Sequence, residues 1–565
     1  MSANEMKLRS RQWFQEGTYE SLMNRASVRA QGFTADVFEN RPVIGICNSW
    51  SELVHCNVHL RAVAEAVKRG VWAAGGFPLE FPTISLGEYY MRPTTMLYRN
   101  LMAMDVEESI RANPLDGVVL LCGCDKTIPA QLMGAASADL PAIMVPGGPM
   151  LSGQWGGRTI GAGTDTRRLF EQFRAGRVTE QELCEVEGGL LRSPGHCNVM
   201  GTASTMSSLA EAMGLALPGC ANVPGPDARR LAMAEQSGRR IVEAVWEDLR
   251  PSRIVTPAAL RNAIAVDMAL GGSTNAVVHL IAIAGRLGID LPLAEFDRIS
   301  RRTPYLANVK PSGEYLMEDF YYAGGLPALM KEILPLLDGT AITITGKSVA
   351  ENVATAECHN RSVIRAAEEP LHAEGGTVVL HGNLAPDGAV LKQTAASPHL
   401  LRHRGKAYVF ENYQHMRAQI DSEDLPVDAP TVLVMKNCGP RGGPGFPEWG
   451  HIPMPRVLLQ RDITDMVRIS DARMSGTSFG TVLLHLAPES AVGGPLAAVQ
   501  TGDEISLDVP ARRVDLCLSS GEIERRLAGF VPAPAPYERG YGKLFLDHIT
   551  QANLGCDFDF LRAVK

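Results

Sequence analysis

The sequence predicts an α/β protein in two parts: an N-terminal α/β domain with a parallel sheet over residues 1–369, and a C-terminal β-rich, barrel-like domain over residues 370–565. Three observations predict this fold class. The chain of 565 residues is too long for one ordinary hydrophobic core. Residues 118–150 alternate a short apolar run, a helix of small residues and a second apolar run, which is typical of a βαβ unit. After about residue 370, short β-type runs are separated by Gly, Pro and Asp turns.

In the N-terminal part, predicted strands and helices alternate after a polar, helical lead-in over residues 7–40. Predicted strands cover residues 42–47, 77–85, 118–121 and 141–145, and predicted helices cover residues 58–69, residues 94–112 and a stretch that begins at Thr127. Residues 153–164 are glycine-rich but lack the GxGxxG spacing, so they predict no dinucleotide site.

Three further helices are predicted over residues 201–213, 256–270 and 275–287. Thr256 is the expected N-cap of the second, with Pro257 at its first position. The break at residues 271–274, Gly-Gly-Ser-Thr, allows two interpretations. Free amides there could bind a carboxylate, but a kink capped by Ser273 or Thr274 is favoured.

The C-terminal part contains seven predicted short strands, over residues 377–381, 407–410, 431–435, 467–469, 481–485, 504–509 and 513–516. A rigid proline-rich spacer at residues 532–536 precedes a short C-terminal tail. The sequence contains no internal repeat and no low-complexity linker.

Composition describes a soluble globular protein, with 45% hydrophobic and 21% charged residues. The formal charge of -8 is mild for this length and gives no reason to expect a nucleic acid or a membrane as partner. No apolar targeting segment begins the sequence and no apolar run is long enough to span a bilayer, so we expect a cytoplasmic protein. In a reducing cytosol, the eleven cysteines should be thiols or metal ligands.

Three cysteines stand in polar turns directly before predicted helices, namely Cys56, Cys124 and Cys197. The helix dipole favours a thiolate at such positions. Local CxxC pairs, the usual mark of structural zinc, are absent around them. The residues alone leave two interpretations open: unligated thiols, or an iron-sulfur cluster with one iron open to a ligand. Around Cys124, the adjacent Asp125 and Lys126 favour chemistry over a purely structural loop.

A second group consists of carboxylates that suit Mg²⁺: Glu88 after a predicted strand, Asp125 beside Cys124, and Glu448 in a glycine-proline turn. Each alone is more often a solvated surface acid. Lys126 is a cation that would repel a metal, so its default role is a salt bridge or a contact to a substrate carboxylate.

A third group lies in the segment Ile469 to Thr477, where a strand end passes into a glycine turn. The turn is expected to expose Ser475 and Thr477. No GxSxG elbow surrounds Ser475, which argues against an acyl-enzyme serine.

At these residues the chain resembles the dihydroxy-acid and sugar-acid dehydratase family, over nearly its whole length. The motifs that carry the resemblance are NSWSELVHCN at 48–57, CDKTIP at 124–129, GHCNVMGTAST at 195–205, GGSTNAVVHL at 271–280, GPRGGPGFPE at 439–448 and DARMSGTSFGT at 471–481.

The resemblance implies an enzyme that dehydrates vicinal hydroxy acids to 2-keto-3-deoxy acids with an iron-sulfur cluster and Mg²⁺. Cys56, Cys124 and Cys197 would hold the cluster, a 2Fe-2S cluster in preference to 4Fe-4S. Magnesium would be held by Glu88, Asp125, Glu448 and Lys126, the last being carbamylated in the family and so an anionic oxygen ligand. Ser475 matches the family's proposed base, and Thr477 is a second catalytic candidate. The family also implies a site at the boundary between the domains and a homodimer or homotetramer.

The ARMSGT wording resembles the sugar-acid branch, the arabinonate and xylonate dehydratases among others, and implies a sugar-acid substrate. Gly442-Gly443 departs from the Gly-Tyr expected in pentonate enzymes. The alternative is a dihydroxy-acid dehydratase of branched-chain amino-acid biosynthesis. An iron-sulfur sensor without turnover is disfavoured, because it gives no role to the matched carboxylates and Ser475.

Overall fold

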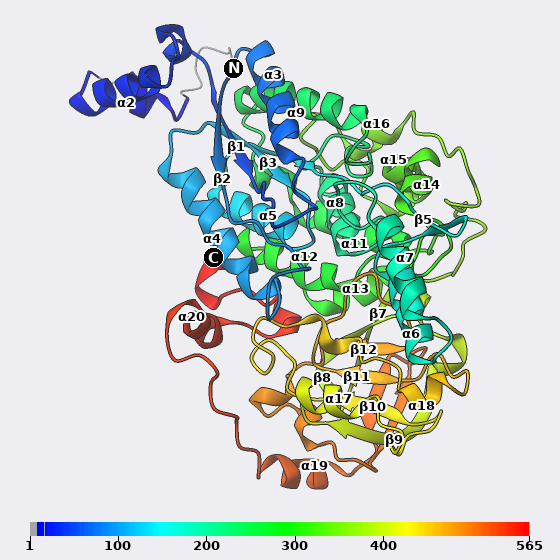
Figure 1. The fold of residues 1–565 in the computed structure, drawn as a ribbon. Coiled ribbons are helices and arrows are strands. Elements are labelled where there is room, and N and C mark those ends of the chain that lie inside the picture. Colours follow the sequence, from blue (N-terminus) through cyan, green and yellow to red (C-terminus); the bar gives the residue numbers. More distant parts are fainter. Residues whose placement is uncertain (1–7, 16, 564–565) are drawn as a thin grey trace.

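The structure is a computed structural model that describes residues 8–15 and 17–563. Figure 1 shows the helix-rich N-terminal part, coloured blue to green, stacked on a barrel coloured yellow to orange. The predicted fold class is confirmed: a parallel sheet in the N-terminal part and a closed barrel in the C-terminal part. No helix in the described part of the chain is both long and apolar enough to cross a membrane.

The N-terminal sheet contains four parallel strands in the order β2-β1-β3-β4. They are β1 (Val43–Asn48), β2 (Phe77–Pro82), β3 (Gly117–Cys122) and β4 (Ala142–Pro146). Strands β1, β3 and β4 are buried at every position, because helices cover both faces of a parallel sheet. Their apolar runs therefore predicted them well, and all four carboxyl ends lie at one edge of the sheet.

The helices that frame this sheet are α3 (Leu60–Ala73), α4 (Met96–Ala112), α5 (Thr127–Ala138), α8 (Thr202–Ala212), α9 (Ala228–Trp246), α11 (Pro257–Leu270) and α12 (Asn275–Arg286). Helices α3 and α9 touch backbone to backbone at Gly70 and Gly238, where a Cβ atom would collide with a carbonyl of the other helix. Thr256 caps α11 as predicted, since its side chain accepts the Ala259 N–H.

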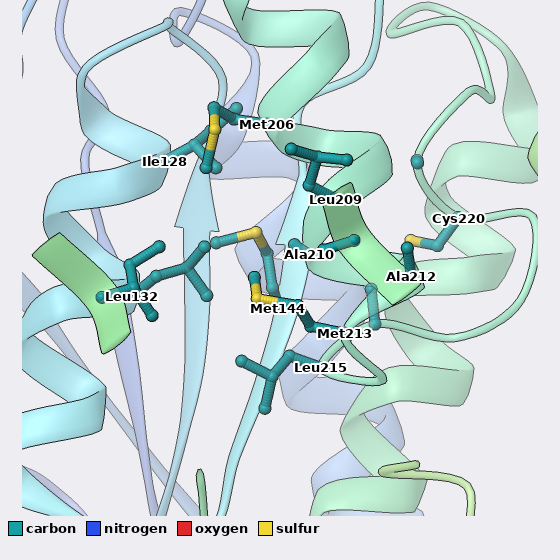
Figure 2. Packing of buried hydrophobic residues seen from close by; sticks show 14 of the residues in the cluster. Ile128, Leu132, Met144, Met206, Leu209, Ala210, Ala212, Met213, Leu215 and Cys220 are labelled. Atoms are coloured by element: carbon teal, nitrogen blue, oxygen red, sulfur yellow. The ribbon is translucent and has the colours of Figure 1, made fainter. Parts of the chain in front are cut away.

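Helix α8 is buried along its whole length. Figure 2 shows Met206 and Leu209 of α8, and Met213 directly after it, beside Met144 of β4 and the side chains of α5. The large apolar side chains of α8 therefore pack in the first core, which agrees with the burial of the whole helix.

The C-terminal part closes into a barrel in the order β10-β11-β12-β8-β7-β14-β13-β9. Its strands are β7 (Thr377–Gly382), β8 (Ala385–Lys392), β9 (Arg402–Phe410), β10 (Val432–Met435), β11 (Arg468–Ser470), β12 (Val482–Leu484), β13 (Glu504–Asp508) and β14 (Arg513–Leu516). The sequence analysis missed β8, because its first residues, Ala-Pro-Asp-Gly, have the composition of a turn. Pairing with β7 and β12 overrides that local preference.

The remaining helices and the β5-β6 hairpin surround these two cores. They are α1 (Arg11–Phe14), α2 (Tyr19–Ala30), β5 (Gly153–Trp155), β6 (Arg158–Ile160), α6 (Thr164–Arg174), α7 (Glu180–Leu190), α10 (Pro251–Ile254), α13 (Leu293–Ser300), α14 (Met317–Tyr322), α15 (Gly325–Glu332), α16 (Val349–Val353), α17 (Tyr413–Gln419), α18 (Arg456–Leu459), α19 (Ser520–Leu527) and α20 (Gly540–His548).

Helix α20 and the residues after it return to the N-terminal part. Phe545 and Phe558 pack in one cluster with Met96 and Leu97 of α4. The buried guanidinium of Arg99 donates to the carbonyl oxygens of residues 555 and 556. The C-terminal residues therefore pack against the N-terminal part of the chain. The division of the chain at residue 370 stays a prediction.

Candidate functional site

A cavity of about 620 Å³ lies where the carboxyl ends of the N-terminal sheet face the loops of the barrel. It is lined by every predicted site residue except Lys126, namely Cys56, Glu88, Cys124, Asp125, Cys197, Glu448, Ser475 and Thr477. Five of these come from loops of the α/β part and three from loops of the barrel. The cavity is therefore formed between the two domains, at the edge where open α/β sheets bind ligands.

The three thiols meet on one wall of this cavity. Cys56 and Cys124 form a small buried cluster with Val54. The two cysteine loops touch because Gly123 has no side chain: a Cβ there would lie 2.6 Å from the Cys56 carbonyl oxygen. A hydrogen bond with Cys124 and burial raise the pKa of Cys56 well above its usual value. Burial and the nearby Cys124 raise the pKa of Cys197 to about 12.

The neighbouring Cys124 therefore makes ionisation of both Cys56 and Cys197 harder. Thiolates are the form in which cysteine binds metal, and iron or zinc compensates their mutual repulsion. Three thiols at one cavity wall, with no disulfide recorded for any of the eleven cysteines, form a donor set that fits a thiolate-ligated metal group.

A second donor set lies beside the thiols. One carboxylate oxygen each of Glu88, Asp125 and Glu448 lies within 4.8 Å of the others. None is a solvated surface acid, because their side chains are 24%, 14% and 19% exposed. Burial raises the pKa of Glu448, which Arg473 opposes. Burial also acts to raise the pKa of Glu88, but Lys126 and Arg473 together lower it below its usual value.

Lys126 is fully buried beneath the carboxylates, and its ammonium nitrogen lies among them. The Nζ atom is 2.7 Å from Asp125, 3.5 Å from Glu88 and 3.9 Å from Glu448. It thus stands where a cation shared by the three acids would stand. Lys126 is the residue directly before α5, in the short loop that follows β3. The Cys124 N–H donates to the Thr127 hydroxyl at the start of the helix, which holds this loop at the cavity.

Arg473 is a second buried cation, which the sequence analysis did not single out. Its guanidinium donates to Glu448 at 2.5 Å, to Glu88 at 3.3 Å, to Thr94 at 2.8 Å and to the Phe446 carbonyl oxygen at 2.6 Å. Arg473 therefore connects a barrel loop to the α/β part. Its position within the DARMSGT motif could have marked Arg473 as a site residue. The sequence alone did not do so, because an arginine near a glycine turn is usually solvent-exposed.

The break between α11 and α12 is a capped kink that also contacts the site. The Ser273 hydroxyl accepts the Asn275 N–H at 3.2 Å, whereas Thr274 makes no capping bond. The Asn275 amide reaches the Met474 carbonyl oxygen at 3.1 Å and Glu448 at 3.4 Å. The favoured interpretation of this segment is supported, and Asn275 is a site contact that the sequence analysis missed.

Ser475 and Thr477 lie on the barrel side of the cavity, with their hydroxyl oxygens 3.0 Å apart. The expectation that the glycine turn exposes both was wrong for Thr477, which is 5% exposed. The start of α6 covers it, since the Thr164 hydroxyl donates to the Thr477 carbonyl oxygen and the Arg167 guanidinium donates to the Thr477 hydroxyl.

The chain is similar to known proteins over almost its whole length. Two family models match, described as Dihydroxy-acid/6-phosphogluconate dehydratase N-terminal over residues 41–352 and C-terminal over residues 362–556. The chain is 53% identical to an L-arabonate dehydratase of Azospirillum brasilense, covering 99% of this chain and 98% of the relative. It is 52% identical to an L-arabinonate dehydratase of Rhizobium leguminosarum bv. trifolii and 50% identical to a 6-deoxy-6-sulfo-D-gluconate dehydratase of Pseudomonas putida, each comparison covering 99% of this chain and 97% of the relative.

Proposed function

The chain belongs to the dihydroxy-acid/6-phosphogluconate dehydratase family, and we propose that it removes water from a sugar acid of four to six carbons to give the 2-keto-3-deoxy acid. It is a hydro-lyase of the sugar-acid branch, to which the compared relatives belong. The observation that carries the proposal is the meeting of three thiols, three carboxylates and Ser475 at one cavity of about 620 Å³.

The thiols and carboxylates fit two metal groups. Cys56, Cys124 and Cys197 would hold an iron-sulfur cluster with one iron open to a ligand, and the resemblance to the 2Fe-2S members of the family favours 2Fe-2S over 4Fe-4S. Glu88, Asp125 and Glu448 would hold Mg²⁺. When bound, these groups supply Lewis acids that weaken the bond to the leaving hydroxyl and acidify the proton at C2.

Lys126 fits this site only if it loses its positive charge. Mg²⁺ binds oxygen at about 2.0–2.1 Å, so an ion held by the three carboxylates would lie next to the ammonium group that now contacts them. Carbamylation of Lys126 by carbon dioxide converts the cation into an anionic oxygen ligand and removes the conflict. The buried Arg473 remains as the counter-charge that keeps so many anions together.

Ser475 is the group that this proposal assigns to proton transfer. Ser475 lines the cavity from a loop of the barrel, whereas the three thiols line it from loops of the α/β part. A serine hydroxyl serves as a base only where neighbouring positive charge and hydrogen-bond donors stabilise its anion. The branched dihydroxy acid of valine synthesis is the alternative substrate. Arg92, Arg167 and Arg417 line the cavity together with apolar residues such as Met91 and Trp449, so the preference for a sugar acid rests on the relatives.

A substrate panel tests the proposal. Protein reconstituted without oxygen with iron, sulfide, Mg²⁺ and bicarbonate is mixed with sugar acids of four to six carbons, including L-arabinonate and 6-deoxy-6-sulfo-D-gluconate, and with the branched dihydroxy acid. Formation of 2-keto acid is followed by derivatisation with semicarbazide. We expect at least one sugar acid to be converted faster than the branched acid, and the reverse ranking would overturn the proposal.

A further inference from the structure

A chain of hydrogen bonds connects a charged residue of α6 to Ser475. The Arg167 Nη1 atom donates to the Thr477 hydroxyl oxygen at 2.7 Å, and that oxygen is 3.0 Å from the Ser475 hydroxyl oxygen. An arginine only donates hydrogen bonds, so the direction of the first bond is fixed. The backbone N–H of Thr477 also points to the Ser475 oxygen, at 3.4 Å.

The first bond is compatible with a second one in which the Thr477 hydroxyl donates to the Ser475 oxygen. Among the described residues, the Thr477 hydroxyl contacts only Arg167 and Ser475. One of its lone pairs receives the Arg167 N–H, which leaves its own proton able to donate to the Ser475 oxygen. Ser475 then keeps its own proton, or a negative charge after losing it, free toward the cavity that it lines.

This arrangement is held rigidly by the first turn of α6. Arg167 also donates to the Gly163 carbonyl oxygen at 3.0 Å, and the Thr164 hydroxyl donates to the Thr477 carbonyl oxygen at 2.8 Å. Gly163 has a φ of +86°, and a Cβ atom there would collide with the Thr477 hydroxyl. The absence of a side chain at Gly163 thus allows α6 to approach the serine turn.

The charge of Arg167 is not neutralised by an acid. Within the described chain, no carboxylate lies within ion-pair distance of Arg167, whereas the nearby Arg174 pairs with Asp421. Arg167 affects the pKa of two titratable groups, Cys197 and His451. Burial and Cys124 raise the pKa of Cys197 against the effect of Arg167. Burial, Arg468 and Arg167 lower the pKa of His451, which favours the neutral imidazole, so His451 does not add a second positive charge.

We propose that Arg167 is a positioning residue for Ser475: it fixes Thr477 as a hydrogen-bond donor to the serine oxygen and so prepares that oxygen to accept the C2 proton of the substrate. In this step the C2–H bond breaks and an O–H bond forms at Ser475. Ser475 reacts as its alkoxide. The electron pair left at C2 forms the C2–C3 double bond as the C3–O bond breaks, and the proton taken up by Ser475 passes to the leaving hydroxide, which gives water and restores the alkoxide. The inference rests on the proposed function.

The test compares holoenzyme variants at Arg167 with a matched control. Replacing one preorganised donor to an oxyanion typically costs about 10²-fold to 10³-fold in kcat, so Arg167→Ala should lose about 10²-fold with little change in KM. Guanidinium ion added to the buffer should raise the kcat of Arg167→Ala by at least about tenfold, because it replaces the lost side-chain group. The kcat of Arg167→Lys should lie between those of Arg167→Ala and wild type. Arg168→Ala removes a neighbouring cation that stacks on Phe479 and should match wild type with or without guanidinium.

Two further measurements test whether Arg167 acts on Ser475 through Thr477, which we call the relay, or in another way. If Arg167 acts through Thr477, the double variant of Arg167→Ala with Thr477→Val should be no slower than Thr477→Val alone, because coupled residues are non-additive. Labelling of Ser475 by methanesulfonyl fluoride, followed by mass spectrometry, should slow in Arg167→Ala at unchanged iron content. Additive losses, equal labelling rates, or a raised KM at unchanged kcat would each overturn the relay. Lack of turnover by both wild type and Arg168→Ala would instead count against the proposed function.

Discussion

Replacing Arg473 by methionine should destabilise the metal-free protein far more than the magnesium-loaded protein. Arg473 is fully buried and contacts Glu88 and Glu448, so methionine removes the charge while it keeps much of the volume. Without Arg473, only Lys126 remains near these carboxylates, at 3.5 and 3.9 Å. The pKa of both acids then rises, because a cation that opposes the effect of burial is gone: the first such cation for Glu448, and the second, after Lys126, for Glu88.

The expected loss follows from these contacts. Breaking a buried ion pair by removing one partner costs about 3–5 kcal/mol, because an uncompensated charge stays behind. Arg473 contacts two carboxylates, the Thr94 hydroxyl and the Phe446 carbonyl oxygen, so the upper half of that range is expected without metal. Mg²⁺ bound by the same carboxylates replaces the lost positive charge, and the loss should then fall by about half.

Scanning calorimetry with and without Mg²⁺, in buffer that contains bicarbonate, measures both losses. Arg468→Met is the matched control, since Arg468 is equally buried in the barrel and pairs with Asp465 at 2.9 Å, away from the candidate metal site. The control should be destabilised to the same extent in both conditions. An equal shift of the midpoint for Arg473→Met with and without Mg²⁺ would refute the reasoning that Arg473 and a divalent cation balance the same charges.

Three further perturbations address separate parts of the account. Replacing Cys56, Cys124 or Cys197 by serine should remove the visible absorbance and the bound iron. The control Cys517→Ser, at an exposed cysteine, should keep both. Equal bleaching of all four variants would mean that the wrong cysteines were chosen as ligands. Ser475→Ala should keep its iron and lose about 10²-fold to 10⁴-fold in single-turnover rate, and wild-type loss of a C2 deuteron would exclude it as the base. Burial and then Arg473 lower the pKa of His485 to about 3 from 6.5, so its contribution to stability is present above pH 6.5 and is lost as the pH falls. His485→Asn, which suits the positive φ of 58° at this position, should remove about 2 kcal/mol of the destabilisation between pH 7 and pH 5, and an unchanged pH dependence of the unfolding midpoint would contradict this.

Local pattern was enough to predict the elements that are buried on both faces. Strands β1, β3 and β4 are short apolar runs between turn residues, and their chemistry-bearing loops follow directly in the sequence. Cys124 and Asp125 could therefore be placed at a strand end from the sequence alone. Strand β8 could not be predicted, because only its partners β7 and β12 make an extended conformation favourable for its turn-like first residues.

The electrostatics of the site depend on contacts that no local pattern records. Arg473 and Glu88 are 385 residues apart in the chain, yet their side chains are in contact. Thr477 lies in a turn of the kind that is usually exposed, and is buried only because α6 packs over it. The family resemblance named most of the acids and thiols, but the burial of Lys126 and the roles of Arg473 and Asn275 required the three-dimensional arrangement.

The most direct test of the central claim is the NMR spectrum of the product formed from L-arabinonate in deuterated water by reconstituted protein. The account predicts a 2-keto-3-deoxy acid that has lost the C2 proton and carries one solvent-derived deuteron at C3, because the enol takes up a proton from solvent at that carbon. The same sample of Cys124→Ser protein, which lacks one of the three cavity thiols, should form none. Wild-type protein with full iron and magnesium that forms no keto acid from any sugar acid, or Cys124→Ser protein that forms it at the wild-type rate, would contradict the account.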